Sequence, residues 1–207
     1  MKYLCASILL ASALITTGAE PSAEAQAARA RAYQLFDQKQ FEASAEEFRK
    51  YLGEAADDYT TQTDYASLLA QLGRHAEAAR VLEAVQQKQP RNEAASFKLG
   101  VVYLTLKRAD DAEKVFAALE KSNNRDMAAA ASDALARLRE ERAREARYKS
   151  EENVYKLAGE FKHEEVVREI EKLERTGELS HGMEMQRLYS MASLKQYAQA
   201  LERANRL

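Results

Sequence analysis

Small and apolar residues recur along this chain in a fixed order, with a period of 34 residues. A small residue stands at positions 32, 66 and 100, and a larger apolar residue follows each of them three positions later. A second small residue stands at positions 44, 78 and 112, and a bulky residue follows each of them four positions later. Spacings of three and four place such residues on one face of a helix. The pattern therefore predicts pairs of helices that pack through equivalent positions.

Two further copies of the pattern follow after an interruption. Val154 and Leu188 occupy the first column and Val166 and Ala200 the second, so that three of the four positions hold a larger residue where a small one is usual. The step from Ala112 to Val166 is 54 residues instead of 34. A period of this length is typical of stacked arrays, in which a single unit cannot bury its apolar face alone. We expect the small residues to lie where two helices cross, so that a larger side chain would hold their backbones apart.

The segments "SFKLGVVY" and "ADDAEKVF", residues 96–103 and 109–116, resemble the tetratricopeptide repeat (TPR) family. The residues that match its pattern are Leu99, Gly100, Tyr103, Ala112 and Phe116. The preceding copy matches at Ala66, Leu69, Gly73, Ala78, Leu82 and Pro90. The chain departs from the family at Ser96, where Trp is common, and at Asn124, where Pro is common. The resemblance implies an all-α fold, an α-solenoid of stacked antiparallel helix pairs (a TPR superhelix).

The interruption divides the expected fold into two lobes. Residues 25–126 form a lobe of three repeats, residues 127–148 a long connecting helix, and residues 149–207 a second lobe of two degenerate repeats. The connecting segment is rich in Ala and then in Arg and Glu, and we expect ion pairs between Arg137 and Glu141 and between Glu140 and Arg144. Two roles remain open for this helix: a rigid spacer, or a docking surface that uses Arg137, Arg142, Arg144 and Arg147.

Composition agrees with a helical fold. Seven Gly, two Pro and no Trp, with many Ala, Glu, Lys, Arg and Leu, favour helices over sheets. A formal charge of −2 gives no basic surface for a nucleic-acid partner.

The first 19 residues are typical of a secretory signal peptide: Lys2, an apolar run from Tyr3 to Ile15, and small residues before Glu20. A retained anchor is the alternative. Cys5, the only cysteine, would be removed with the signal. We therefore expect a periplasmic, exported bacterial TPR protein without disulfides, and without direct membrane insertion after cleavage.

No motif for catalysis or for metal binding is found. The three histidines, His75, His163 and His181, are not spaced as ligands on one helix face. No Gly-rich phosphate loop or nucleophile elbow is present, so we expect no enzyme, no cofactor and no metal.

The resemblance implies that the first helix of each pair lines a concave groove. The expected groove residues are Arg29, Tyr33, Phe36, Ser67, Phe97, Val101, Leu104, Tyr155, Met185 and Tyr189. Such a stripe suits a peptide with apolar anchors. Alternatively, these side chains pack on a neighbouring repeat or on the long helix. One TPR subclass captures a C-terminal carboxylate with Lys and Asn; only Arg29 and Lys98 resemble such a set here, which argues against that mode.

Two functions are considered, and an enzyme is a third and less favoured alternative. The first is a periplasmic protein–protein interaction scaffold that binds a peptide or protein partner during assembly of a cell-envelope or export complex. The alternative is the N-terminal periplasmic TPR arm of a larger outer-membrane polysaccharide or protein exporter. The sequence does not indicate the partner's identity or the oligomeric state.

Overall fold

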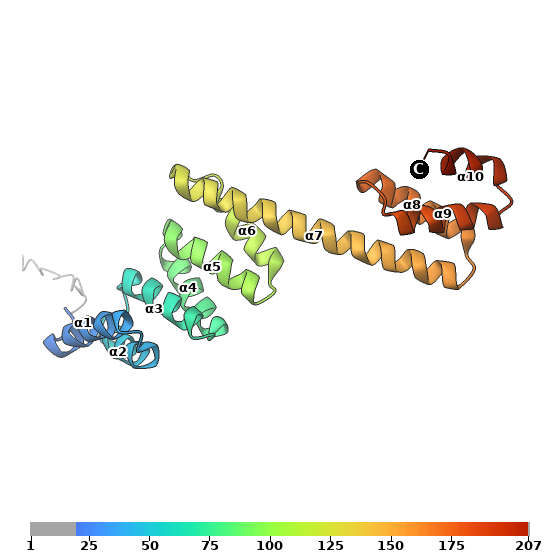
Figure 1. The fold of residues 1–207 in the computed structure, drawn as a ribbon. Coiled ribbons are helices and arrows are strands. Elements are labelled where there is room, and N and C mark those ends of the chain that lie inside the picture. Colours follow the sequence, from blue (N-terminus) through green and yellow to red (C-terminus); the bar gives the residue numbers. More distant parts are fainter. Residues whose placement is uncertain (1–19, 207) are drawn as a thin grey trace, which may run out of the picture. The chain divides into compact units, whose positions relative to one another are not determined.

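The computed structural model describes residues 20–206. Within that range the chain forms ten α-helices and no strand (Figure 1). The helices are α1 (Ala23–Asp37), α2 (Phe41–Glu54), α3 (Tyr59–Gln71), α4 (His75–Lys88), α5 (Glu93–Thr105), α6 (Ala109–Leu119), α7 (Arg125–Gly159), α8 (His163–Thr176), α9 (His181–Ser193) and α10 (Tyr197–Ala204). The predicted all-α fold of antiparallel helix pairs is confirmed. The expected signal peptide lies outside the described residues.

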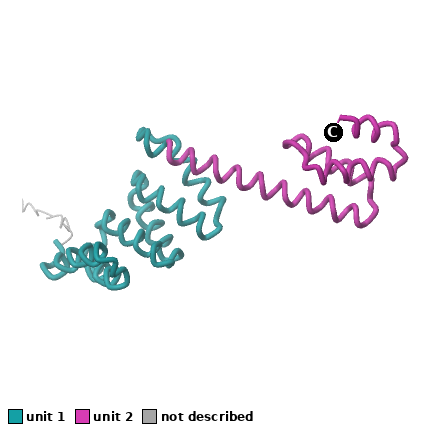
Figure 2. Tube along the Cα trace, viewed as in Figure 1, with its two compact units in different colours: residues 1–128 teal, residues 129–207 magenta. Residues whose placement is uncertain are grey.

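The chain divides into two compact units, residues 1–128 and residues 129–207 (Figure 2). In the first unit α1 packs on α2 (pair 1), α3 on α4 (pair 2) and α5 on α6 (pair 3). Neighbouring pairs meet where α2 touches α3 and where α4 touches α5, and α3 also touches α5. This nearest-neighbour pattern is that of a stacked array.

Side-chain caps fix where the first helices begin. Ser22, Asp58 and Asn92 each accept a hydrogen bond from the backbone N–H three residues later, at 3.0–3.1 Å. Such a cap satisfies one of the N–H groups that a helix start leaves unpaired.

The predicted columns are buried in the first four pairs. The first column contributes Ala32, Ala66, Gly100 and Val154, and the second contributes Ser44, Ala78, Ala112 and Val166. The bulky residues that follow the second column, Phe48, Leu82, Phe116 and Ile170, are also buried. The Ser44 hydroxyl donates to the Ala32 carbonyl at 2.7 Å, which joins the two columns in pair 1.

Gly100 needs a different explanation from the one expected. The nearest atoms to a Cβ at this position belong to the ring of Phe116, and not to the backbone of α6. The small residue therefore makes room for an aromatic ring instead of allowing two backbones to approach.

The long helix α7 continues without a break through the expected end of the connecting helix at residue 148, and ends at Gly159. Its first half buries Ala131, Leu135 and Leu138. The predicted pair of Glu140 with Arg144 is formed at 2.9 Å. The predicted pair of Arg137 with Glu141 does not form in the part of the chain that the structure describes. A pair that was not predicted, Glu145 with Lys149, is formed one turn further along α7 at 2.7 Å.

The second unit has its own apolar core. Val154 of α7 packs with Val166, Ile170 and Leu173 of α8 and with Met183 of α9. The last part of α7 and α8 thus form pair 4, and α9 and α10 form pair 5. In pair 5 the pattern fails: Leu188 and Ala200 are only half-buried, and α10 has no buried residue in the range that the structure describes.

Candidate functional site

The groove residues expected in the first unit lie on α1, α3 and α5, the first helices of their pairs. We call this set the first-helix stripe: Arg29, Tyr33, Phe36, Ser67, Phe97, Val101 and Leu104. Phe36 and Val101 are exposed, at 38% and 44%, and the other five are half-buried. The stripe is therefore partly surface and partly packing.

Tyr33 and Phe97 take part in packing within their own pairs. The Tyr33 ring meets Phe48 edge-on, with centroids 5.0 Å apart. The Phe97 ring meets Phe116 in the same way, at 5.5 Å. Both predicted groove residues thus brace the second helix of the pair, and removing either ring would disturb the fold as well as the surface.

A polar network crosses the stripe and links its three helices. The Tyr33 hydroxyl donates to Asp64 Oδ2 at 2.8 Å, and Lys98 Nζ donates to the Ser67 hydroxyl at 2.6 Å. Lys98 also lies 3.9 Å from Asp64 Oδ1. Burial and the hydrogen bond to Asp64 raise the pKa of Tyr33, so the phenol stays a donor at neutral pH.

Asp64 was missed in the sequence analysis. It shares a column with Lys98, 34 residues further on, and this spacing is the signal that could have found it. Opposite charges in one column of adjacent repeats face each other across the stacking interface.

Arg29 is held at the start of the stripe. Its guanidinium lies 5.4 Å from the centre of the Tyr51 ring and 3.7 Å from Asp58 Oδ2. Asp58 also caps α3 and accepts from the Tyr51 hydroxyl at 2.9 Å. Burial is the largest single effect and acts to raise the pKa of Asp58, but hydrogen bonds from Thr61 and Tyr51 and the charge of Arg29 together lower it. Arg29 therefore already has an anionic partner within the protein.

The exposed apolar side chains lie at the two ends of the stripe. Phe36 on α1 rests against Phe41, with ring centroids 5.6 Å apart. Exposed Val101 lies on α5, three positions before the half-buried Leu104 on the same helix face. Between these helices α3 contributes Ser67 and Asp64. The arrangement offers apolar contacts at both ends and hydrogen-bonding groups in the middle.

In the second unit the expected groove residues are Tyr155 on α7 and Met185 and Tyr189 on α9. All three are exposed. The Tyr155 hydroxyl lies beside Gly182, 3.1 Å from where a Cβ would be. The Tyr189 ring meets the His163 ring at 5.7 Å. Each of the two tyrosines thus contacts a different helix of that unit.

The described part of the chain is residues 20–206. No group of three or more His, Cys, Asp and Glu in this range could hold a metal ion. None of the helices described combines the length and the apolar character that crossing a membrane requires.

Residues 69–138 match the family model of the tetratricopeptide repeat. Solved structures agree in fold. The TPR2AB domain of yeast Sti1 in complex with pHSP90 has 14% identity, a TM-score of 0.54, and coverage of 87% of this chain and 75% of that one. The Sgt2 TPR domain of Aspergillus fumigatus has 18% identity, a TM-score of 0.53, and coverage of 60% and 84%.

A third structure, the first TPR of Spaghetti (RPAP3) bound to the HSP90 peptide SRMEEVD, has 17% identity, a TM-score of 0.51, and coverage of 58% of this chain and 94% of that one. No curated protein matches the sequence. The stacked helix pairs define an α-solenoid. Together with the family match over residues 69–138, they show a fold built of tetratricopeptide-type repeats.

Proposed function

We propose that this protein is an interaction scaffold whose first-helix stripe binds a peptide segment of a partner protein. The observation that carries the proposal is the placement of exposed Phe36 and Val101 on either side of the polar groups of α3. Apolar anchors with hydrogen-bonding groups between them suit an extended or helical peptide. Two of the similar structures hold HSP90-derived partners, which supports peptide binding as the mode.

The stripe does not favour a terminal carboxylate. Lys98 already contacts Asp64 and Ser67, and Arg29 lies beside Asp58. An incoming carboxylate would compete with these internal partners. We therefore propose that apolar side chains of the ligand, and not its terminal charge, provide most of the affinity.

Peptides selected from a random library on the purified protein would test the proposal. Val101→Glu places a charge at the exposed end of the stripe, and we expect it to weaken binding of the selected peptides by roughly tenfold or more. Ala76→Glu is the matched control, because Ala76 is exposed on a second helix, α4. Equal affinities of the two variants would contradict the proposal.

The exposed side chains of the second unit provide a second contact surface in the same proposal. Tyr155→Ala and Tyr189→Ala remove exposed rings. Each variant is expected to weaken binding of a longer partner while the circular dichroism stays unchanged. Unchanged affinity in the double variant would restrict binding to the first unit.

The proposal includes export to the periplasm and a role in assembling a cell-envelope or export complex. The support is the signal-like sequence of residues 1–19. Mass spectrometry of the protein from an envelope fraction tests this part, and a mature N-terminus at Glu20 is expected. A retained Met1 in a cytoplasmic fraction would contradict it. A reading frame that continues beyond Leu207 would favour the alternative of an exporter arm.

A further inference from the structure

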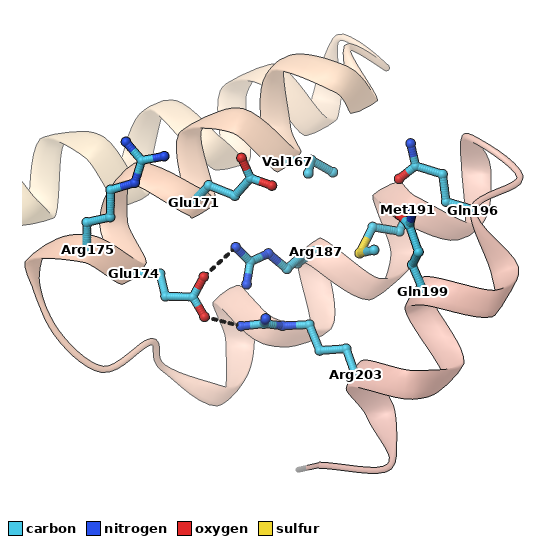
Figure 3. A pocket seen from close by; sticks show the side chains of 9 residues that line it. All are labelled: Val167, Glu171, Glu174, Arg175, Arg187, Met191, Gln196, Gln199 and Arg203. Carbon is cyan, nitrogen blue, oxygen red and sulfur yellow. Dashed lines mark hydrogen bonds and ion pairs between the residues drawn. The ribbon is translucent and has the colours of Figure 1, made fainter.

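A cavity of about 450 Å³ lies within the second unit, among α8, α9 and α10 (Figure 3). Its walls combine two apolar residues, two glutamines and five charged residues. They are Val167, Glu171, Glu174, Arg175, Arg187, Met191, Gln196, Gln199 and Arg203. Small-molecule sites in proteins typically fall in this range of size.

Arg187 occupies a position that is apolar in the best-formed repeat. It stands 88 residues after Leu99, in the same column, and is 3% exposed. One side of its guanidinium donates to Glu174 Oε2 at 2.9 Å. Nη1 is buried and has no hydrogen-bond partner among the residues that the structure describes. A buried donor left unpaired is destabilising, so this atom calls for an acceptor.

Glu171 is an exposed carboxylate that also lines the cavity and has no partner in the part of the chain that the structure describes. Its equivalent in pair 2 is Glu83, which accepts from the Tyr103 hydroxyl at 2.8 Å and from Arg108 at 3.2 Å. The positions of those two donors are taken by Met191 and Gln196 in the second unit. Within residues 20–206 Glu171 has no hydrogen bond or ion pair. The same replacements remove a ring and a guanidinium, which opens the space.

Two of the other charged groups, Glu174 and Arg203, hold the walls in place. The remaining one, Arg175, is exposed and has no hydrogen bond or ion pair in residues 20–206. Arg203 bonds both carboxylate oxygens of Glu184, at 2.7 and 2.8 Å, and also reaches Glu174 at 2.5 Å. Figure 3 shows Arg187 and Arg203 meeting the same Glu174 carboxylate from α9 and α10. These ions satisfy one another, so the buried free donor of Arg187 and the exposed charges of Glu171 and Arg175 remain for a ligand.

We propose that this cavity binds a small zwitterion, whose carboxylate pairs with Arg187 Nη1 and whose ammonium pairs with Glu171. An isolated anion would satisfy Arg187 but would also meet the unpaired carboxylate of Glu171. An isolated cation would pair with Glu171 but would leave the Arg187 donor without an acceptor. A ligand with both charges complements the lining, and Val167 and Met191 offer an apolar surface to its side chain.

A matched set of probes tests the proposal by calorimetric titration. L-leucine carries both charges, 4-methylpentanoate lacks the ammonium, and 3-methylbutylamine lacks the carboxylate. At equal ionic strength we expect leucine to bind saturably and at least roughly tenfold more tightly than either half. Binding of one half as tight as that of leucine, or no binding of any probe to the wild-type protein, overturns the proposal.

Substitutions locate the binding. Arg187→Leu installs the residue found at the equivalent position 99, and Glu171→Gln removes the acceptor charge; each should reduce leucine affinity by roughly tenfold or more. Arg31→Leu and Glu83→Gln are the controls, because they alter the equivalent positions of earlier repeats. Arg31 there pairs with Glu47 at 2.8 Å. Both controls should leave the affinity for leucine unchanged. Because Glu171 has no internal partner, Glu171→Gln tests the site even if Arg187→Leu perturbs folding. Unchanged leucine binding in folded Glu171→Gln would overturn the proposal.

Discussion

Gly100 and Phe116 fill one space between them: a Cβ on residue 100 would lie 2.6 Å from Cζ and 2.7 Å from a Cε of the Phe116 ring. Atoms do not approach so closely without a shift. The ring has little freedom to move, because it is fully buried and lies edge-on to Phe97. Pair 2 fills the equivalent space differently, with Ala66 and Leu82, both buried.

Gly100→Ala is therefore expected to lower the free energy of unfolding by about 1–2 kcal/mol, although alanine is the better helix former by about 1 kcal/mol. Adding Phe116→Leu recreates the combination of pair 2. The two single variants each lower the free energy of unfolding, and the loss in the double variant should be smaller than the sum of these two losses by at least about 0.5 kcal/mol. Urea denaturation of the four proteins measures this coupling.

Gly53→Ala is the control for helix propensity. No atom lies within 4 Å of a Cβ at Gly53, so this substitution should stabilise the protein by a few tenths of a kcal/mol up to about 1. Equal effects of alanine at positions 53 and 100 would show that Phe116 accommodates the methyl group.

The turn inside each helix pair has a left-handed residue at the same position. The φ values are 60° at Lys39, 75° at Gly73, 59° at Lys107, 59° at Phe161 and 61° at Lys195. This conformation costs a non-glycine residue about 1 kcal/mol. Lys107→Gly should therefore raise the free energy of unfolding by about 0.5–1 kcal/mol, and Gly73→Lys should lower it by a similar amount. Thermal melts check the pair, and changes of the same sign would contradict the explanation.

Acid should weaken the second unit through Glu174. Hydrogen bonds from Arg187 and then Arg203 lower its pKa from 4.5 to about 2. A depressed pKa in the folded state means that the stabilisation is present above pH 4.5 and is lost as the pH falls towards 2. We expect the melting temperature of the wild type to fall more steeply over this window than that of Glu174→Gln. Parallel curves would show that the carboxylate is not stabilised by the fold.

Helix α10 should open more readily than the others. It buries no residue in the described range, and Tyr197 and Leu201 are 63% and 64% exposed. Amide hydrogen exchange should therefore be fastest there and slowest in α3 and α5, whose residues are the most buried. If the amides of α10 were protected from exchange as strongly as those of α5, this prediction would be contradicted, because no described residue packs over the exposed face of α10.

The sequence pattern predicted helix pairs well because burial at spacings of three and four is a local property. The position of Phe48, Leu82 and Phe116 in one column was enough to identify the core of the first three pairs. The pattern wrongly predicted that Leu188 and Ala200 would be buried, because a pattern identifies the apolar face of a helix but not whether another helix covers that face.

The candidate sites were less accessible from sequence. Tyr33 and Phe97 lie at groove positions, yet their rings pack inward, and only contacts with Phe48 and Phe116 reveal this. Arg187 could have been noticed, since it replaces a leucine of the repeat. The free state of Glu171 could not, because it depends on donors that Met191 and Gln196 fail to supply.

The most direct test of the central claim is nuclear magnetic resonance of the labelled protein during titration with a selected peptide. If the first-helix stripe binds the peptide, the largest amide shifts will lie in α1, α3 and α5, with Phe36 and Val101 among them, and saturation will follow one binding curve. Shifts confined to α2, α4 and α6 would contradict the account.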